Sequence, residues 1–194
     1  DRYSRYTAVY YLTTKNSTEV KHAMEQFISD HKEWLTNTKD GSIEQWHTDN
    51  GAEFTSDDLN DFCQEISVRR SYSIPYAPPQ NAQAERIWGI LLRPMRIFFA
   101  QSGQPHQFWN YAMDQACRIH NSLPSTSLPN GISPYQAVTG KLPNISSVRT
   151  WGCECYYLLP KRDRVGKLAP RSVPAIHLGS DPKRKGWLIY VPSL

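Results

Sequence analysis

Hydrophobic and polar positions follow two periods along the chain, one typical of strands and one typical of helices. Residues 6–12 are rich in β-branched and aromatic side chains and predict a strand, as do residues 43–48 and 68–73. Apolar residues recur instead at helical spacing in four stretches, at 20–35, 59–66, 87–98 and 105–121. Strands and helices that alternate in this way indicate an α/β layer fold.

Capping and helix-breaking residues set the expected ends of these helices. Asn16 begins a capping-box sequence before the first helix, and Thr55 is placed to cap the second. Asn81 is a good N-cap for the third helix. Pro94 lies inside that third helix, and we expect it to kink or break the helix, because an interior proline costs about 3 kcal/mol.

The last part of the chain has a different pattern. Residues 122–147 are rich in Pro, Ser, Asn and Gly and are expected to form an irregular connection. Strand-like runs follow at 153–159, 173–178 and 187–191, with basic residues between them. We therefore expect two domains, residues 1–145 and residues 146–194, the second being a small basic β module.

Composition indicates a globular protein with an uneven charge. The chain is 39% hydrophobic and 21% charged, and no apolar run approaches the ~20 residues of a membrane span. Residues 1–85 contain 8 Lys/Arg against 14 Asp/Glu, whereas residues 86–194 contain 14 against 4. The acidic half suits a cation, and the basic half suits a polyanion, although an ordinary solvated basic surface would give the same balance.

The cysteines predict neither a zinc site nor a disulfide framework, because none of the four forms a C-x-x-C pair. Cys63 and Cys117 lie on apolar helix stripes and are expected to be buried thiols. Cys153 and Cys155 are two apart in a predicted strand and should point to one face.

Two carboxylates, Asp49 and Glu85, are the candidates for chemistry. Asp49 ends a predicted strand at an Asp-Asn-Gly turn, and Glu85 opens a helix after a Pro-rich loop, with 35 residues between them. Such oxygen ligands suit hard divalent cations, which can flank a phosphodiester in a two-metal site. Each also has an ordinary explanation: a turn whose Asn and Gly tolerate positive φ, and a first-turn carboxylate that faces the helix dipole.

The ordered motifs resemble the catalytic core of retroviral and retrotransposon integrases. They are H-T-D-N-G-x-x-F at 47–54, I-P-Y-x-P at 74–78 and Q-N-x-x-x-E-R at 80–86. Further stretches are similar to the copia class of retrotransposon polyproteins: D-R-Y-S-R-Y-T at 1–7, F-W at 108–109, S-P-Y-Q-A-V-T-G-K at 133–141, W-G-C at 151–153, I-H-L-G at 176–179 and K-G-W at 185–187. The resemblance covers nearly the whole chain in order.

The resemblance implies an RNase H-like fold that lacks its first strand, followed by a small SH3-like β-barrel. It implies that Asp49 and Glu85 hold Mg²⁺ or Mn²⁺ for 3′-end processing and strand transfer of element DNA into target DNA. The family uses a further aspartate, which we expect upstream, because the context of Asp1 resembles the start of the family's second strand. We therefore expect a polyprotein fragment that is inactive by itself.

The expected partners are DNA and further copies of the protein, in an intracellular setting that is nuclear for the intact integrase. By position in the family, Asn50 and Gly51 lie near target DNA, and Tyr76 and Asn81 lie near the element's DNA end. Helical periodicity and basic charge add Arg86, Arg93, Lys183, Arg184 and Lys185 as DNA contacts.

Two other functions remain open at this point. One is a non-catalytic, nucleic-acid-binding remnant or domesticated protein with an RNase H-like fold. The other is a different RNase H-like nuclease or transposase.

Overall fold

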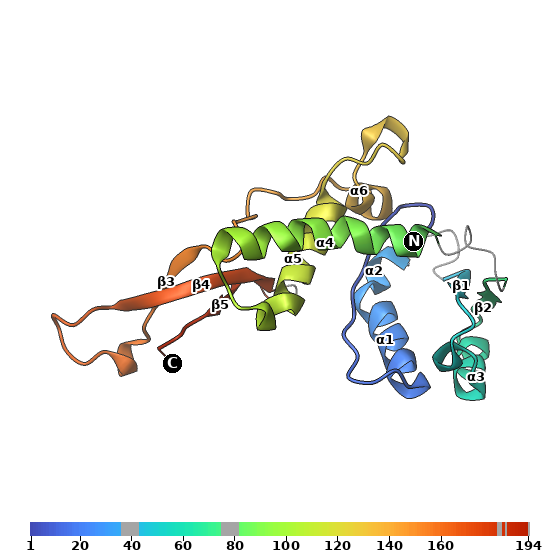
Figure 1. Cartoon of the computed structure of the whole chain (residues 1–194), viewed down its shortest axis with the longest axis horizontal. Coiled ribbons are helices and arrows are strands. Elements are labelled where there is room, and N and C mark those ends of the chain that lie inside the picture. Colours follow the sequence, from blue (N-terminus) through green and yellow to red (C-terminus); the bar gives the residue numbers. More distant parts are fainter. Residues whose placement is uncertain (36–42, 75–81, 182–183, 185, 194) are drawn as a thin grey trace. The chain divides into compact units, whose positions relative to one another are not determined.

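The computed structural model describes residues 1–35, 43–74, 82–181, 184 and 186–193 (Figure 1). Its contacts divide the chain into two compact units, residues 8–89 and residues 90–194 together with 1–7. The 8–89 unit contains α1 (Ser17–Asp30), α2 (Lys32–Leu35), β1 (Gln45–Thr48), η1 (Ala52–Phe54), α3 (Asp57–Glu65), β2 (Arg69–Tyr72) and the start of α4 (Ala82–Ser102). The 90–194 unit contains the rest of α4, η3 (His106–Phe108), α5 (Trp109–Ser122), η4 (Pro129–Gly131), α6 (Pro134–Thr139), β3 (Glu154–Leu158), η5 (Lys161–Asp163), β4 (Ser172–Asp181) and β5 (Gly186–Tyr190).

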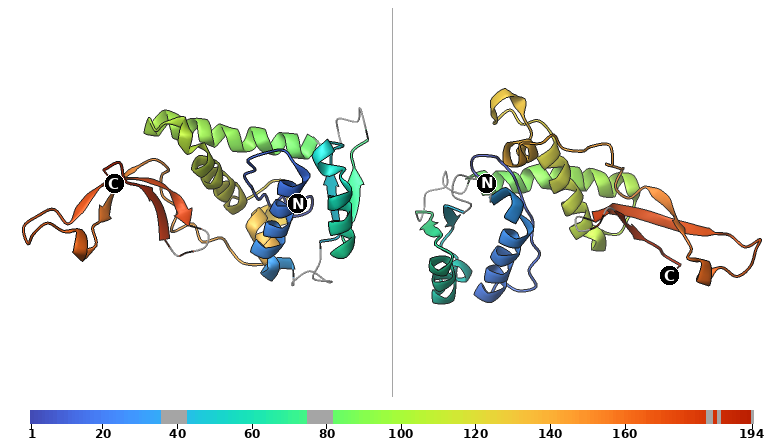
Figure 2. Two further views of the ribbon diagram at one scale, coloured as in Figure 1. Left: turned by 90° about the horizontal axis from the view of Figure 1, so that it is seen from below. Right: turned by 180° about the vertical axis from the view of Figure 1, so that it is seen from behind.

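The core of the 8–89 unit forms where α1 packs against α3, which lie side by side in Figure 2. Strands β1 and β2 pair in parallel, and Trp46 of β1 lies against this core. The buried residues are those of the predicted apolar stripes: Val20, Met24, Leu59, Phe62 and Cys63. The helices predicted at 20–35 and 59–66 are confirmed, the first of them interrupted at His31. The strands predicted at 43–48 and 68–73 are confirmed in slightly shorter form.

The expected cap of α1 is confirmed. The Asn16 side chain accepts a hydrogen bond from the Glu19 backbone N–H at 2.8 Å. The Glu19 carboxylate turns outward to the preceding loop, where it accepts hydrogen bonds from the backbone and hydroxyl of Thr14 and from the backbone of Thr13. These bonds, chiefly those from Thr14, lower the pKa of Glu19.

Helix α3 begins one residue later than the sequence predicts. Ser56, and not Thr55, is its N-cap, with its hydroxyl accepting from the Leu59 N–H at 3.4 Å. Thr55 instead ends η1, where its N–H bonds to the Ala52 carbonyl. The short helix therefore occupies the residue that would otherwise cap the longer one.

The expected break at Pro94 is wrong, since α4 runs from Ala82 to Ser102 without interruption. Proline removes the helical hydrogen bond to the carbonyl of Ile90. Leu91 and Met95 are buried on either side of the proline. Burial of this apolar stripe offsets the one lost hydrogen bond.

The predicted strand at 6–12 is also wrong, because these residues form no strand ladder in the described part of the chain. A β-prone segment becomes a strand only where a partner strand pairs with it. The Asn121 side chain instead holds the backbone of Thr7, accepting from its N–H at 3.0 Å and donating to its carbonyl at 2.7 Å. This amide pairs with the segment as a neighbouring strand would.

Helix α6 lies within the stretch that was expected to be irregular. Ser133 caps the helix through the Gln136 N–H at 3.1 Å, and Pro134 occupies the first helical turn. Gly140 ends it with a left-handed φ of 68°. The start and stop residues of this helix are therefore readable in the sequence, but at six residues it is too short to show a hydrophobic period.

The three predicted C-terminal strands are confirmed, and they form an antiparallel sheet in the order β3-β4-β5. Strand β4 packs against α5. Trp151, which is 2% exposed, lies with its ring 5.9 Å from Phe98 and 5.1 Å from Phe99. Contacts within this unit therefore cross the expected domain boundary after residue 145.

Gly152 is the glycine whose replacement the fold should tolerate least. Its φ is +74°, and a Cβ there would lie 2.3 Å from the Ser102 Cβ. We expect Gly152→Ala to lower the free energy of unfolding by about 2–4 kcal/mol, from the left-handed backbone and the overpacking together. Urea denaturation measures the change.

Gly89→Ala is the matched control, because a Cβ at this helical position meets nothing within 4 Å. It should stabilise the protein by about 0.5–1 kcal/mol through helix propensity. Equal unfolding midpoints for the two variants would contradict this account of Gly152.

Candidate active site

Asp49 follows the last residue of β1 and is exposed. Its Oδ1 accepts a hydrogen bond from the Gly51 N–H at 3.1 Å, which closes an Asx turn. Gly51 has an ordinary φ of −56°, so its role does not depend on positive φ. This carboxylate is thus held in a defined direction just beyond the strand.

Two carboxylates converge on Gly51. A Cβ at this position would lie 2.7 Å from Oε2 of Glu53 and 3.1 Å from Oδ1 of Asp49. Sequence analysis assigned no role to Glu53, although it lies within the same motif. Its position four residues after Asp49, across a glycine, is the signal that could have identified it.

Ser73 ties the Asp49 turn to β2. Its N–H and hydroxyl donate to the Thr48 carbonyl at 2.9 and 3.3 Å. Its own carbonyl accepts from the Asn50 side-chain amide at 2.9 Å. Asn50, expected near target DNA, therefore uses its amide nitrogen to hold the turn.

His47 lies on the same face of the two-stranded sheet as Ser71 and Ser73. Its Nδ1 lies 2.8 Å from the Ser71 hydroxyl, and its Nε2 lies 3.4 Å from the Ser73 hydroxyl. Gln45 donates to the Ser71 hydroxyl from the next position of this face. Period-two alternation places Trp46 on the opposite face, toward the core.

Glu85 lies in the first turn of α4 and is exposed, as are Arg86 and Arg93 further along the helix. The expected DNA contacts Tyr76 and Asn81 lie outside the described residues. Within the described ranges, no three His, Cys, Asp or Glu side chains gather closely enough to hold a metal ion. The described residues therefore supply carboxylates for a metal site but not a complete ligand set.

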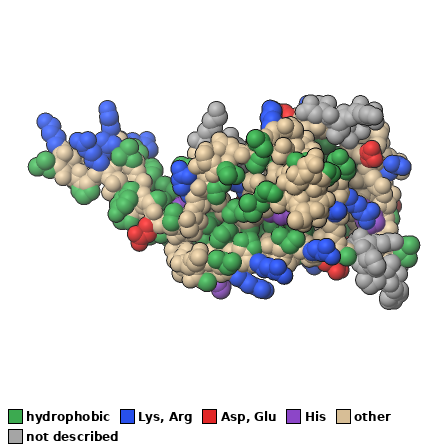
Figure 3. Space-filling model, turned by 90° about the horizontal axis from the view of Figure 1, so that it is seen from above, with side chains coloured by type: hydrophobic (Ala, Val, Ile, Leu, Met, Phe, Trp, Pro, Cys, Tyr) green, Lys and Arg blue, Asp and Glu red, His purple; other side chains and the backbone are tan. Residues whose placement is uncertain are grey.

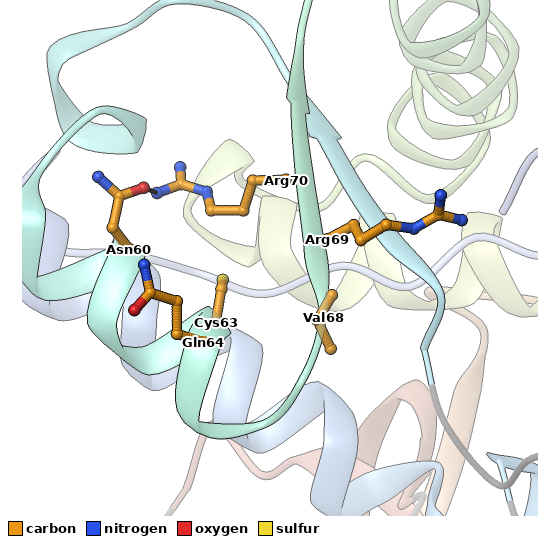
Figure 4. A pocket seen from close by; sticks show the side chains of 6 residues that line it. All are labelled: Asn60, Cys63, Gln64, Val68, Arg69 and Arg70. Atoms are coloured by element: carbon orange, nitrogen blue, oxygen red, sulfur yellow. Dashed lines mark hydrogen bonds between the residues drawn. The ribbon is translucent and has the colours of Figure 1, made fainter.

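A shallow pocket of about 250 Å³ lies between α3 and β2 (Figure 4). Arg70 points into it and donates to the Asn60 side chain at 2.6 Å and to the Phe54 carbonyl. Its guanidinium also lies 5.1 Å from the centre of the Tyr72 ring. Arg69 points the other way, as alternation along the strand requires. Arg70 is thus a structural cation that joins α3 and η1 to the sheet.

Basic side chains gather over the β3–β4 hairpin, where Figure 3 shows a cluster of Lys and Arg. The exposed cations of this connection are Lys161, Arg162, Lys167 and Arg171. Arg184 is exposed in the β4–β5 turn, whereas the expected contacts Lys183 and Lys185 lie outside the described residues. Val165 and Leu168 are also exposed on the hairpin, so apolar and basic groups share this surface.

The four cysteines are free, as expected. Cys63 and Cys117 are buried, and burial raises the pKa of Cys117 to about 12, so this thiol is protonated at neutral pH. No helix in the described part of the chain is long and apolar enough to cross a membrane.

Two family models match the chain. Residues 1–78 match the integrase core domain, and residues 153–194 match the retroviral polymerase SH3-like domain. The chain is 28% identical over 99% of its length to a retrovirus-related Pol polyprotein from the tobacco transposon TNT 1-94, and 30% identical over 97% to that of the Arabidopsis transposon RE1. The chain thus resembles the Pol polyproteins of copia-type retrotransposons over nearly its whole length, with an integrase core match followed by a retroviral SH3-like match. It spans 14% and 12% of the length of these two relatives.

Solved integrase structures share the RNase H-like fold of this chain. The catalytic core of BIV integrase matches 71% of the chain and 80% of its own at a TM-score of 0.53, with 18% identity. The HTLV-2 integrase core in complex with magnesium matches 70% of this chain and 78% of its own chain, with a TM-score of 0.53 and 23% sequence identity. A simian T-cell lymphotropic virus intasome in complex with a PP2A regulatory subunit matches 95% of this chain and 67% of its own chain, with a TM-score of 0.56 and 19% sequence identity. The predicted fold class is confirmed.

The different surroundings of Arg69 and Arg70 make a matched test of the pocket. We expect Arg70→Ala to lower the free energy of unfolding by about 1.5–3 kcal/mol, because it leaves the Asn60 and Phe54 acceptors without a charged donor. Arg69→Ala, at an exposed position on the same strand, should change it by less than about 0.5 kcal/mol. Urea denaturation of both variants measures the difference, and equal effects would show that the pocket contacts contribute little.

Proposed function

We propose that the protein that contains this chain integrates element DNA into target DNA. The observation that carries the proposal is the Asp49 turn, which holds an exposed carboxylate at the end of β1 in the motif that the integrase family shares. Glu85 supplies a second exposed carboxylate, from the first turn of α4, with 35 residues between the two. The reaction would be phosphoryl transfer, first to water and then to the freed 3′-hydroxyl.

Asp49 and Glu85 fit divalent metal ions by the chemistry of their donors. Both offer exposed carboxylate oxygens, which Mg²⁺ and Mn²⁺ prefer, and Glu53 adds a carboxylate beside Asp49. Bound metal would activate the nucleophile and stabilise the leaving oxygen. The chain's own part is to hold the Asp49 carboxylate in place through the Gly51 N–H and to supply cations for DNA.

The proposed DNA contacts lie on three parts of the chain. Arg86 and Arg93 are seven residues apart on α4, so they point from one side of the helix. Asn50 and Gly51 belong to the Asp49 turn, and Tyr76 and Asn81 precede α4 in the sequence. The remaining contacts, Lys183, Arg184 and Lys185, lie between β4 and β5 in the sequence. The arginines and lysines would contact DNA phosphates, whereas the Asp49 turn would lie near the DNA strand that reacts.

We further propose that residues 1–145 are the catalytic core and residues 146–194 the SH3-like module, that copies of the protein assemble on DNA, and that the intact integrase acts in the nucleus. By itself the 194-residue chain should not join DNA ends, since Asp49 and Glu85 are two of the three acidic ligands that the family uses.

A non-catalytic DNA-binding role is the second candidate. It is favoured by the exposed cations of the β3–β4 connection, Lys161, Arg162, Lys167 and Arg171, which can meet phosphates without any metal. Sequence-independent DNA binding with no metal-dependent joining, even in the parent integrase, would support it.

The two carboxylates provide the direct test of integration. In the parent integrase, we expect Asp49→Asn and Glu85→Gln each to abolish 3′-end processing and strand transfer, because each removes a negative charge from the metal site with little change in volume. The melting temperature in metal-free buffer should stay within about 2 °C, as for other exposed substitutions. Strand-transfer assays on element-end DNA measure activity, and undiminished turnover in either variant would refute the assignment.

The β4–β5 turn should bind DNA through phosphates. Residues 151–194 hold 8 Lys/Arg against 3 Asp/Glu. Phosphate contacts release counterions from DNA. A plot of the logarithm of the association constant against the logarithm of the salt concentration should therefore fall with a slope of ~0.9 per phosphate contact. Replacing Lys183, Arg184 and Lys185 by Gln should flatten that slope in fluorescence-anisotropy titrations of duplex DNA.

Lys15 and Lys32 are exposed lysines outside the proposed contacts, and their replacement by Gln is the control. It should leave the salt slope unchanged. Equal slopes for the triple variant and the parent would show that the turn is only a solubilising surface.

A further inference from the structure

Four polar side chains form one connected row across a face of the β1–β2 sheet. Gln45, Ser71, His47 and Ser73 alternate between the two strands, with His47 opposite Ser71 in the parallel register. Gln45 donates to Ser71, Ser71 lies 2.8 Å from His47 Nδ1, and His47 Nε2 lies 3.4 Å from Ser73. The row ends on the carbonyl of Thr48, to which the Ser73 hydroxyl donates at 3.3 Å.

The Thr48 carbonyl can only accept, so a Ser73 hydroxyl that donates there accepts from His47 Nε2. At the other end of the row, the Gln45 amide donates to the Ser71 hydroxyl, which still has its hydrogen and a second lone pair for His47 Nδ1. Both ring nitrogens of His47 therefore lie along the sheet, each next to a serine hydroxyl.

The end of the row brackets Asp49 in the backbone. Ser73 holds the carbonyl of Thr48, the residue before Asp49, through both its N–H and its hydroxyl. Its own carbonyl holds the side chain of Asn50, the residue after Asp49, at 2.9 Å. Ser73 is buried, so these bonds are protected from water. The residues on both sides of Asp49 are therefore held by one serine, which directly follows β2.

We propose that His47 and Ser73 are positioning residues for Asp49, and that the Gln45–Ser71–His47–Ser73 row locks the carboxylate in the direction that its turn gives it. The role in catalysis rests on the proposed function. The lock itself is a property of the folded chain and needs neither metal nor DNA. Partners of this kind behind a metal ligand change metal affinity by about 10–100-fold when removed.

Hydrogen exchange at the Gly51 amide tests the lock, because this N–H donates to Oδ1 of Asp49. Ser73→Ala should speed its exchange about fivefold, the effect of one net hydrogen bond, and Ser73→Thr should restore the parent rate. Ser127→Ala, at an exposed serine, is the matched control. Equal Gly51 exchange in Ser73→Ala and the parent would overturn the proposal.

Two replacements of His47 distinguish the roles of its two ring nitrogens. A Gln amide reaches the place of Nε2, so His47→Gln should keep the bond to Ser73 and the parent exchange rate at Gly51. An Asn amide reaches only the place of Nδ1, so His47→Asn should speed exchange as Ser73→Ala does. Equal rates for the two would overturn the proposal. Failure of strand transfer in the parent integrase, with these exchange results as expected, would instead refute the proposed function alone.

Discussion

The parallel pairing of β1 with β2 is the constraint on which the candidate site depends. Because side chains alternate between the two faces of a strand, one register decides both faces at once. With His47 opposite Ser71, the face that carries Trp46 meets the apolar core, and the other face carries the polar row. A shift of one residue would place Trp46 among the serines and direct His47 into the core. The packing energy of the core therefore also fixes the polar groups that hold Asp49.

Gly51 shows how the same residue pattern can have two physical meanings. An Asp-Asn-Gly sequence suggests a turn that needs positive φ, and the turn is present, but Gly51 adopts an ordinary φ of −56°. A Cβ at this position would instead meet the carboxylates of Glu53 and Asp49, the first of them at the flexible end of its side chain. The glycine therefore leaves room for both carboxylates beside the turn.

The sequence predicted those parts of the fold that depend on local pattern. Apolar spacing identified the buried faces of α1, α3, α4 and α5, and β-branched runs identified the paired strands. It failed where the outcome depends on partners that are distant in the chain. Residues 6–12 have the composition of a strand, but in the described structure Asn121 binds Thr7 across 114 positions instead. Likewise, Asp49 could be identified from its motif, but Ser73 could not, because its role exists only after the two strands pair.

The residues that would bind metal and the residues that hold them are different groups. Asp49 is oriented by a backbone N–H, and its neighbours are held by neutral serine, histidine and asparagine side chains. The site therefore does not rely on a cation to acquire its shape, in contrast to small zinc domains, whose ligands are themselves the scaffold. A carboxylate on such a support can lose its charge with little loss of fold. This separation allows the contribution of charge to be measured apart from the contribution of position.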